Sequence, residues 1–313
     1  MKKLLLPLLI SLANVVYSQS YRSEFGFRTE NDSYLGYGQD QYYTNGLYLT
    51  YRQAVRNNSS SKFIKKTWEA ELGQSMYNAF SGSTASLDKV DRPFAAYLYG
   101  GAKVKLFKPN ESHYQIGLQI GIIGPYALGK EAQEALHKTF GFYEVNGWQF
   151  QVKNAIGLNA SLNFDKLLIR KGRKDLTLMS YANLGNTFLG AGVGVLYRSG
   201  NINPLFKSTS LNSRLSNIVS DSLPARELFF FLRPMMNIVV YNATIQGGMF
   251  QSDKGPATFP PNRVVLSPEI GIMYAKKRLS LNFSVVFKGR ELREQLRSHE
   301  YGSVGIFYRF GQK

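Results

Sequence analysis

The residues best suited to chemistry gather in one polar stretch, ENDSYLGYGQDQYYTNG, which covers Glu30 to Gly46. Within it, the carboxylate of Asp32 could bind a cation through oxygen, and Asn31 and Thr44 carry groups that could donate hydrogen bonds to an oxyanion. A base is missing, because none of the three histidines of the chain lies in this stretch. The stretch alone therefore predicts only part of a hydrolytic site.

A candidate base lies in a second stretch, GKEAQEALHKTFG, from Gly129 to Gly141. Its middle is rich in helix formers and Gly141 is a stop signal, so a short helix is expected here. Gln133 and His137 are four residues apart and share one face of that helix. Neutral histidine could activate a water for ester hydrolysis, which contributes roughly 10² to 10⁴ in rate. The sequence has no G-x-S-x-G elbow, so a serine nucleophile has less support.

The N-terminus predicts export. Residues 1–18, MKKLLLPLLISLANVVYS, combine two lysines, an apolar stretch of signal-peptide length and small or apolar residues at the end. Polar Gln19 and Ser20 follow too early for a membrane anchor of ~20 apolar residues. We therefore expect a signal peptide over residues 1–18 and one mature domain over residues 19–313.

Composition excludes several classes of protein. The chain has no cysteine, which rules out a disulfide framework and a thiolate zinc site. A net charge of +17 would suit nucleic acid inside a cell, but an exported chain meets anionic surfaces such as phosphorylated lipid instead. No nucleic-acid partner is expected.

Apolar and polar residues alternate through several long segments, as in strands with one face toward lipid. In QIGLQIGII, from Gln115, every second residue is Ile or Leu. The alternation also extends through WQFQVKNAIGLNASLNF, residues 148–164, and over residues 279–287 and 304–310. Strands of soluble sandwiches are ~5 to 6 residues long, whereas several of these reach the ~10 residues that a bilayer crossing needs.

These segments predict an all-β protein, an antiparallel transmembrane β-barrel of about twelve strands with a short helix in an extracellular loop. An even number of strands suits a bacterial barrel, and aromatic residues near strand ends suit its interfacial girdles. The connection over residues 200–226 is long and has no evident role. The expected strands lie near residues 22–32, 44–54, 65–76, 93–107, 112–123, 148–164, 174–186, 189–199, 227–241, 264–275, 278–288 and 299–310.

An even strand number places both termini on the periplasmic side and the loops 32–43, 76–92 and 124–147 outside the cell. Face alternation turns Thr44 and Asp32 toward the interior. Asn31 takes the lipid-side position, either past the membrane edge or on a bulge. The helix that carries His137 belongs to the third of these loops, so it should lie at the same rim.

The same topology separates the other two histidines. His113 begins a strand beside the turn KPNES, on the periplasmic side, and is the weakest candidate for the base. His299 starts the last strand at the extracellular end and remains a rival to His137.

Several motifs resemble, in the same order, those of the lipid A 3'-O-deacylases of Gram-negative outer membranes. They are END, DQYYTNGLYLTY, DRPFAAYLYGG, GIIGPYALGKEAQEALHKTFG and GWQFQVKN, and they extend over most of the mature chain. The resemblance implies a twelve-stranded outer-membrane barrel that removes the 3'-linked acyloxyacyl chain from lipid A with calcium dependence. It implies lipid A, as part of lipopolysaccharide, as the partner, and we expect a monomer.

Carried over residue by residue, the resemblance places the catalytic group on Asn31, Asp32, Thr44 and His137, with Tyr43 beside Thr44. Asp32 is the expected calcium ligand, and Gln133 and Glu144 are expected to support the histidine. Two positions depart from the family pattern. Its Lys-Arg cluster before the DR motif is reduced to Lys89, and its acid after the helix aligns with Tyr143, one position before Glu144.

Two non-enzymatic functions remain open from the sequence, a small pore and a structural or adhesive barrel. Inward Lys153, Arg233 and Arg309 without paired acids would favour a pore for anions. A cluster of Asn, Asp, Thr and His at one rim favours the enzyme.

Overall fold

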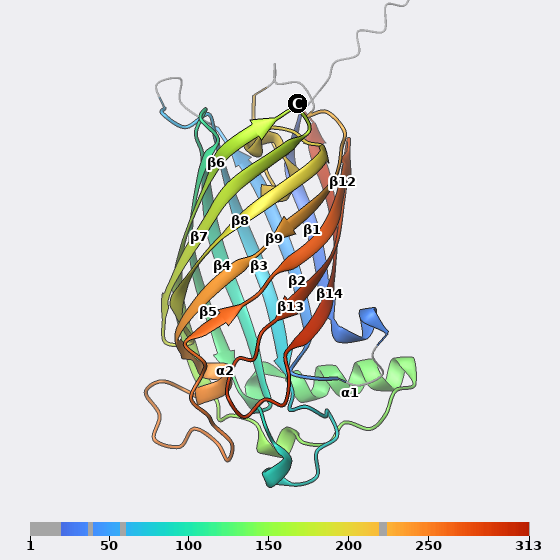
Figure 1. Ribbon diagram of the computed structural model, residues 1–313, viewed down its shortest axis with the longest axis vertical. Helices are drawn as coiled ribbons and strands as arrows, with labels where there is room; N and C mark the ends of the chain where they lie inside the picture. The colour runs from blue at the N-terminus through green and yellow to red at the C-terminus, as the bar shows by residue number, and fades with distance from the viewer. Residues whose placement is uncertain (1–19, 37–39, 57–60, 219–223, 313) are drawn as a thin grey trace, which may run out of the picture.

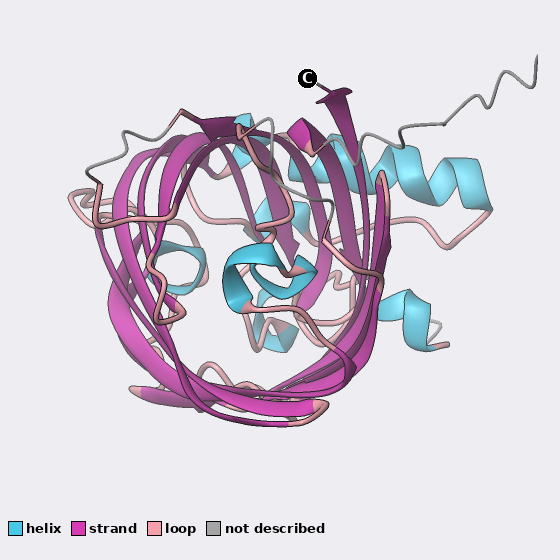
Figure 2. Cartoon of the chain, turned by 90° about the horizontal axis from the view of Figure 1, so that it is seen from above, coloured by secondary structure: helices cyan, strands magenta, loops and turns pink. Residues whose placement is uncertain are grey.

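The computed structural model describes residues 20–36, 40–56, 61–218 and 224–312, which form a closed antiparallel β-barrel (Figures 1 and 2). The expected signal peptide, residues 1–18, lies outside the described residues. The strands are β1 (Tyr21–Asn31), β2 (Tyr43–Val55), β3 (Lys65–Tyr77), β4 (Ala95–Phe107), β5 (Ser112–Ile123), β6 (Ala155–Lys171), β7 (Lys174–Gly185), β8 (Phe188–Asn201), β9 (Glu227–Arg233), β10 (Met235–Asn242), β11 (Val264–Leu266), β12 (Glu269–Lys276), β13 (Leu279–Lys288) and β14 (His299–Gln312).

Helices are few and lie in the connections between strands. The α-helices are α1 (Gly129–Phe140) and α2 (Ala243–Gln246). The 3₁₀ turns are η1 (Asp32–Leu35), η2 (Leu87–Lys89), η3 (Pro125–Ala127), η4 (Trp148–Phe150), η5 (Leu205–Lys207) and η6 (Thr209–Leu211). Within the described chain, no helix has the length and apolar character needed to cross a membrane.

The described segments form a ring of twelve strands, as the alternation predicted, because two of the strands are split. β9 and β10 both pair with β8 and are separated by Pro234 alone. β11 and β12 pair with β10 and β9 in turn and flank Ser267 and Pro268. Proline has no N–H to donate to a ladder, which explains the interruptions. Pairing of β1 with β14 closes the ring.

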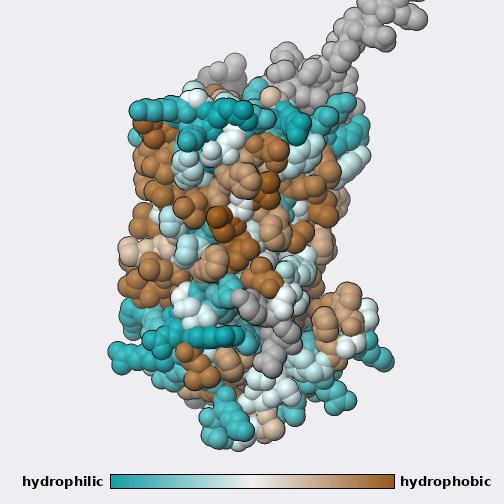
Figure 3. All heavy atoms as spheres, turned by 45° about the vertical axis from the view of Figure 1, so that its right-hand side comes forward, coloured by the Kyte–Doolittle hydropathy of each residue, from teal (hydrophilic) through white to brown (hydrophobic). Residues whose placement is uncertain are grey.

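The outer face of the ring is apolar, as expected for contact with lipid. The alternating side chains of β5 and β6 that face outward, Ile116, Leu118, Ile120, Ile156, Leu158 and Leu162, are all exposed. On the face of the barrel that Figure 3 shows, apolar side chains form a band between two hydrophilic ends. The band corresponds to the apolar surface that a membrane-spanning barrel presents to the lipid chains.

The strand predicted over residues 148–164 is wrong at its start, because β6 covers Ala155–Lys171. The alternation of WQFQV continues into a segment that is not a strand. Gly147 has φ 139°, and Trp148 begins a 3₁₀ turn, where it packs edge-on against Phe94 instead of facing lipid. Lys153 therefore does not point into the barrel. It is exposed in the loop before β6, 3.8 Å from Asp253.

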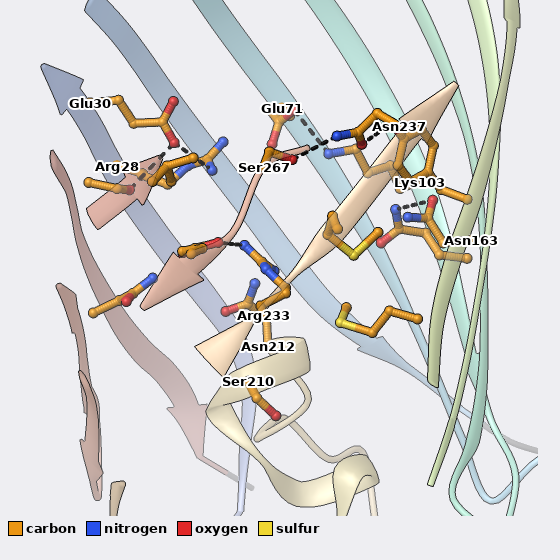
Figure 4. Close-up of a pocket in the computed structure, with 18 of the residues that line it drawn as sticks. Arg28, Glu30, Glu71, Lys103, Asn163, Ser210, Asn212, Arg233, Asn237 and Ser267 are labelled. Carbon is orange, nitrogen blue, oxygen red and sulfur yellow. Dashed lines mark hydrogen bonds and ion pairs between the residues drawn. The ribbon is translucent and has the colours of Figure 1, made fainter. Parts of the chain in front are cut away.

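Ion pairs fill much of the barrel lumen. The guanidinium of Arg52 lies between Glu24, at 2.8 Å, and Glu69, and Lys105 reaches Glu69 at 2.9 Å. Figure 4 shows side chains of several strands pointing into the remaining cavity of about 670 Å³. The two arginines whose lack of paired acids would favour an anion pore do have partners: Arg309 contacts Glu24 at 2.8 Å, and Arg233 contacts Glu269.

The described part of the long connection after β8 folds into the lumen at the end that holds the C-terminus (Figures 1 and 2). This plug, residues 202–218, is held by Glu227, which accepts hydrogen bonds from Ser208 Oγ at 2.7 Å and from the backbone of Thr209 at 2.8 Å. Lys65 Nζ donates to the carbonyls of Phe206 at 2.6 Å and Ser213 at 2.7 Å. The connection therefore closes the periplasmic end.

At the opposite mouth, a buried arginine joins three connections. Arg92 donates from Nε to Glu291 at 3.1 Å and from Nη2 to Thr244 of α2 at 3.0 Å, and its guanidinium stacks over Tyr77. Three extracellular connections are thus tied together above the lumen.

Replacing Arg52 with Met should destabilise the barrel by about 3 to 5 kcal/mol, because Glu24 and Glu69 would be left as buried carboxylates without this partner. The free energy of unfolding can be measured by urea titration in detergent micelles, followed by tryptophan fluorescence. Arg293→Met, at an exposed position outside the strands, is the matched control. Equal unfolding free energies for the two variants would contradict a structural role of the luminal charges.

Candidate active site

The end of β1 places Asp32 outside the barrel wall. Asn31 is the last residue of the strand, and its Oδ1 accepts a hydrogen bond from Ser33 N at 2.7 Å, which caps η1. η1 then lies outside the ring of strands, coloured blue in Figure 1. Asn31 is thus the last residue of the strand and still pairs with Asn45; its expected place past the membrane edge or on a bulge stays a prediction. The inward position expected for Asp32 is not found, because the strand has ended before it.

The start of β2 contains a register shift between Tyr43 and Asn45. Tyr43 takes an inward position, with its hydroxyl on Glu30 and 2.8 Å from Tyr48 Oη, so it is separate from the site. Because of this bulge, the inward position predicted for Thr44 by strict alternation does not follow. Thr44 is buried, and Asn45 pairs across the ladder with Asn31.

The helix α1 brings the predicted base to the same rim. Figure 2 shows it outside the ring of strands. Its first residue, Gly129, is packed so tightly that an added Cβ would lie 2.4 Å from Ala96, and Gly141 ends the helix at φ 71°. Gln133 and His137 are its large buried side chains, one turn apart as predicted.

Both helix residues converge on Asp40, which is 97 residues from His137 in sequence. His137 Nε2 lies 2.7 Å from Asp40 Oδ2, and Gln133 Nε2 donates to the same oxygen at 2.6 Å. The hydroxyl of Tyr143 also donates to it, at 2.9 Å. Trp148 Nε1 in turn donates to Gln133 Oε1 at 2.8 Å, which fixes the orientation of the amide.

The ring of His137 is oriented by the segment that follows the helix. Nδ1 lies 2.7 Å from the carbonyl oxygen of Tyr143, which can only accept, so Nδ1 carries a hydrogen. The rings of Phe142 and Tyr143 pack edge-on against the imidazole. Glu144 is exposed, and the carboxylate that contacts His137 is that of Asp40. Asp40 belongs to the polar stretch that the sequence singled out, but its pairing with the helix had no sequence signal.

Asp32 lies in a different electrostatic setting. Its Oδ2 accepts from Gln41 N at 2.7 Å, and Oδ1 is buried without a hydrogen bond within the described chain. Burial and the nearby carboxylate of Asp40 raise the pKa of Asp32 to about 8. Thr44 Oγ1 and Asn45 Oδ1 are also buried and unpartnered in that part of the chain. Three unsatisfied oxygens thus belong to residues at the adjoining ends of β1 and β2.

Neither of the two other histidines contacts Asp40, Gln133, His137 or Tyr143. His113 is buried, stacked on Phe107, and its Nδ1 is 2.8 Å from Asp165. His299 is buried at the start of β14, and its Nε2 accepts a long hydrogen bond, 3.3 Å, from Tyr43 N.

The fold and the cluster together define an outer-membrane barrel with a buried polar site beside its wall at the extracellular rim. The family model described as outer membrane protein LpxR matches residues 4–310, so the chain belongs to this family and is a protein of the bacterial outer membrane. This confirms the deacylase family that the motifs predicted.

Among solved structures, LpxR from Salmonella typhimurium has a TM-score of 0.72 and 21% sequence identity, over 92% of this chain and 100% of that chain. The beta domain of the Bordetella autotransporter Brka has a TM-score of 0.49 and 9% identity, over 94% of this chain and 99% of that chain. The KdgM porin has a TM-score of 0.39 and 8% identity, over 92% and 99%. No curated protein matches the sequence.

Replacing Asp40 with Ala should loosen α1 from the barrel rim, because the donors on Gln133 and Tyr143 would lose their shared acceptor and His137 would lose its contact with the same oxygen. Each buried donor left unpaired costs about 1–3 kcal/mol. Hydrogen exchange measured by mass spectrometry should become faster over residues 129–140 and stay unchanged in the strands. Asp253→Ala, at an exposed carboxylate on another loop, is the control. Unchanged protection of α1 would show that Asp40 does not hold the helix.

Proposed function

We propose that this protein hydrolyses the ester that links the 3'-acyloxyacyl chain to lipid A, at the extracellular rim of the outer membrane. The observation that carries the proposal is the His137 cluster, formed by Asp40, Gln133, His137 and Tyr143. It lies between α1 and the connection that leads into β2, outside the ring of strands. A lipid of the outer leaflet would meet the protein on this side. Membership of the LpxR family supports lipid A, as part of lipopolysaccharide, as the substrate. We expect the protein to act as a monomer.

His137 is the general base of the proposed reaction. Because Nδ1 is committed to the carbonyl of Tyr143, Nε2 is the nitrogen that can take a proton from water. General base catalysis of this kind contributes about 10²- to 10⁴-fold in rate. Asn31 uses Oδ1 for the helix cap, which leaves its amide nitrogen as a hydrogen-bond donor. The hydroxyl of Thr44 is a further donor at this rim.

The residues around Asp32 fit a calcium ion. Calcium is bound by oxygen atoms from carboxylates, amide carbonyls and hydroxyls, and Asp32 Oδ1, Asn45 Oδ1 and Thr44 Oγ1 are three such atoms without partners. A cation would also offset the repulsion between Asp32 and Asp40. In the described residues no three His, Cys, Asp or Glu side chains form a metal-binding group, so such a site would depend on neutral oxygens. When bound, calcium would polarise the ester carbonyl as a Lewis acid.

The plug and the paired charges of the lumen weigh against the alternative of a passive pore. The plug fills the periplasmic end, Arg92 ties the extracellular connections together, and both Arg233 and Arg309 are neutralised by acids. An anion pore would be favoured by inward arginines without paired acids, and these two arginines are paired.

Mass spectrometry of lipid A from cells with and without the protein tests the proposal. Expression should remove a 3'-acyloxyacyl unit, and His137→Ala should abolish this loss while leaving a barrel that migrates differently in gels before and after heating. His113→Ala and His299→Ala are the matched controls, since neither histidine contacts the His137 cluster, and both should retain most of the activity. Unaltered lipid A with the folded wild-type protein would refute the function. Loss of activity in His299→Ala, with His137→Ala active, would reassign the base.

Calcium dependence is tested separately. Exhaustive chelation should abolish hydrolysis and added calcium should restore it, because the oxygens near Asp32 are expected to hold the ion. Calorimetric titration of the His137→Ala variant with calcium should show binding. The double variant that carries Asp32→Asn as well should show none. Full turnover after chelation, together with no calcium binding, would reject the metal.

A further inference from the structure

One oxygen of Asp40 occupies the point toward which the proposed catalytic side chains converge. Oδ2 is 2.7 Å from Nε2 of His137, 2.6 Å from Nε2 of Gln133 and 2.9 Å from Oη of Tyr143. A ring nitrogen takes a proton only along its single lone pair, and Oδ2 lies at hydrogen-bond distance from that nitrogen. The base therefore cannot reach a water while Asp40 stays in place.

Asp40 is not required to orient the histidine ring. Nδ1 is fixed by the carbonyl of Tyr143, and the imidazole is packed edge-on by Phe142 and Tyr143. The three groups around Oδ2, on His137, Gln133 and Tyr143, could therefore bind something other than Asp40 at that position.

A water molecule would satisfy the same three groups. It could donate one hydrogen to His137 Nε2 and the other to Tyr143 Oη, and accept one from the amide of Gln133. One lone pair would remain free for attack on a carbonyl carbon, and the three distances suit such hydrogen bonds. The position of Asp40 Oδ2 is therefore one that an attacking water could occupy if Asp40 turned away.

We propose that Tyr143 is a catalytic residue that, together with Gln133, positions the attacking water against His137, in the place that Asp40 fills when substrate is absent. This inference rests on the proposed deacylase function and adds to it the residues that handle the nucleophile. Turnover then requires Asp40 to turn away from Nε2. Burial and Asp40 hold the pKa of Tyr143 above its usual range, so its hydroxyl stays neutral and can both donate and accept.

The proposed hydrolysis needs only the ester, one water molecule and these residues. As the water oxygen bonds to the ester carbonyl carbon, one of its protons passes to Nε2 of His137. The tetrahedral intermediate then collapses, the bond to the sugar oxygen breaks, and the proton passes from Nε2 to that oxygen. The products are a fatty acid and a free sugar hydroxyl, and Tyr143 is unchanged.

Tyr143→Phe tests the inference, because it removes only the hydroxyl and keeps both the ring and the carbonyl that holds His137. We expect kcat to fall about 10²-fold with KM nearly unchanged, as for a misplaced reactant. The sharper readout is the choice of nucleophile when methanol is added to the assay. Methanol has one hydrogen to donate, so it cannot satisfy both His137 and Tyr143. Without the hydroxyl, methanol should compete better, and the ratio of fatty acid methyl ester to free fatty acid should rise several-fold.

Tyr126→Phe is the matched control, since this tyrosine is 70% exposed at the same rim, and its rate and product ratio should equal those of the wild type. A lower kcat for Tyr143→Phe with an unchanged product ratio would overturn the inference and leave Tyr143 a structural role. An unchanged kcat would overturn it as well. Absence of any acyl release by the wild type would instead refute the proposed function.

Discussion

Inside a bilayer no water is available to the backbone, so every amide and carbonyl of a membrane-spanning strand must pair with a neighbouring strand. The ring closed by β1 and β14 meets this requirement. Even the two proline interruptions keep it, because both halves of each split strand stay paired with their neighbours. The polar site of this protein lies beyond this paired wall, in the connections where the strands end.

The same closure determines what the interior can be. Side chains alternate, so an apolar outer face leaves a polar inner face. Arginines and carboxylates neutralise one another across the lumen, and the chain after β8 folds back to cover its periplasmic end. A charge left without its partner in such a space is costly. The paired charges and the plug thus stabilise the barrel beneath the rim that carries the loops of the site.

The site shows how loops become rigid enough for chemistry. A capped 3₁₀ turn ends β1, a bulge begins β2, and α1 is held against the rim by Gly129 and Trp148. Each of these features restricts the conformations that one connection can adopt. They meet at the carboxylate of Asp40, whose hydrogen bonds join the β1–β2 connection to the third extracellular loop. Two buried acids, Asp32 and Asp40, lie near each other there, and the calcium ion that we propose would offset their repulsion.

The sequence by itself determined the barrel, because alternation with a period of two depends on each strand's own side chains. It also placed Gln133 and His137 on one helix face, since that spacing is local. The start of β6 was missed because WQFQV alternates as a strand does, while Gly147 turns the chain before it. Only the tertiary structure decided that Asp40 meets His137, that Glu144 does not, and that the chain after β8 closes the lumen. Such contacts join residues far apart in sequence, and no local pattern encodes which distant side chain will fill a buried position.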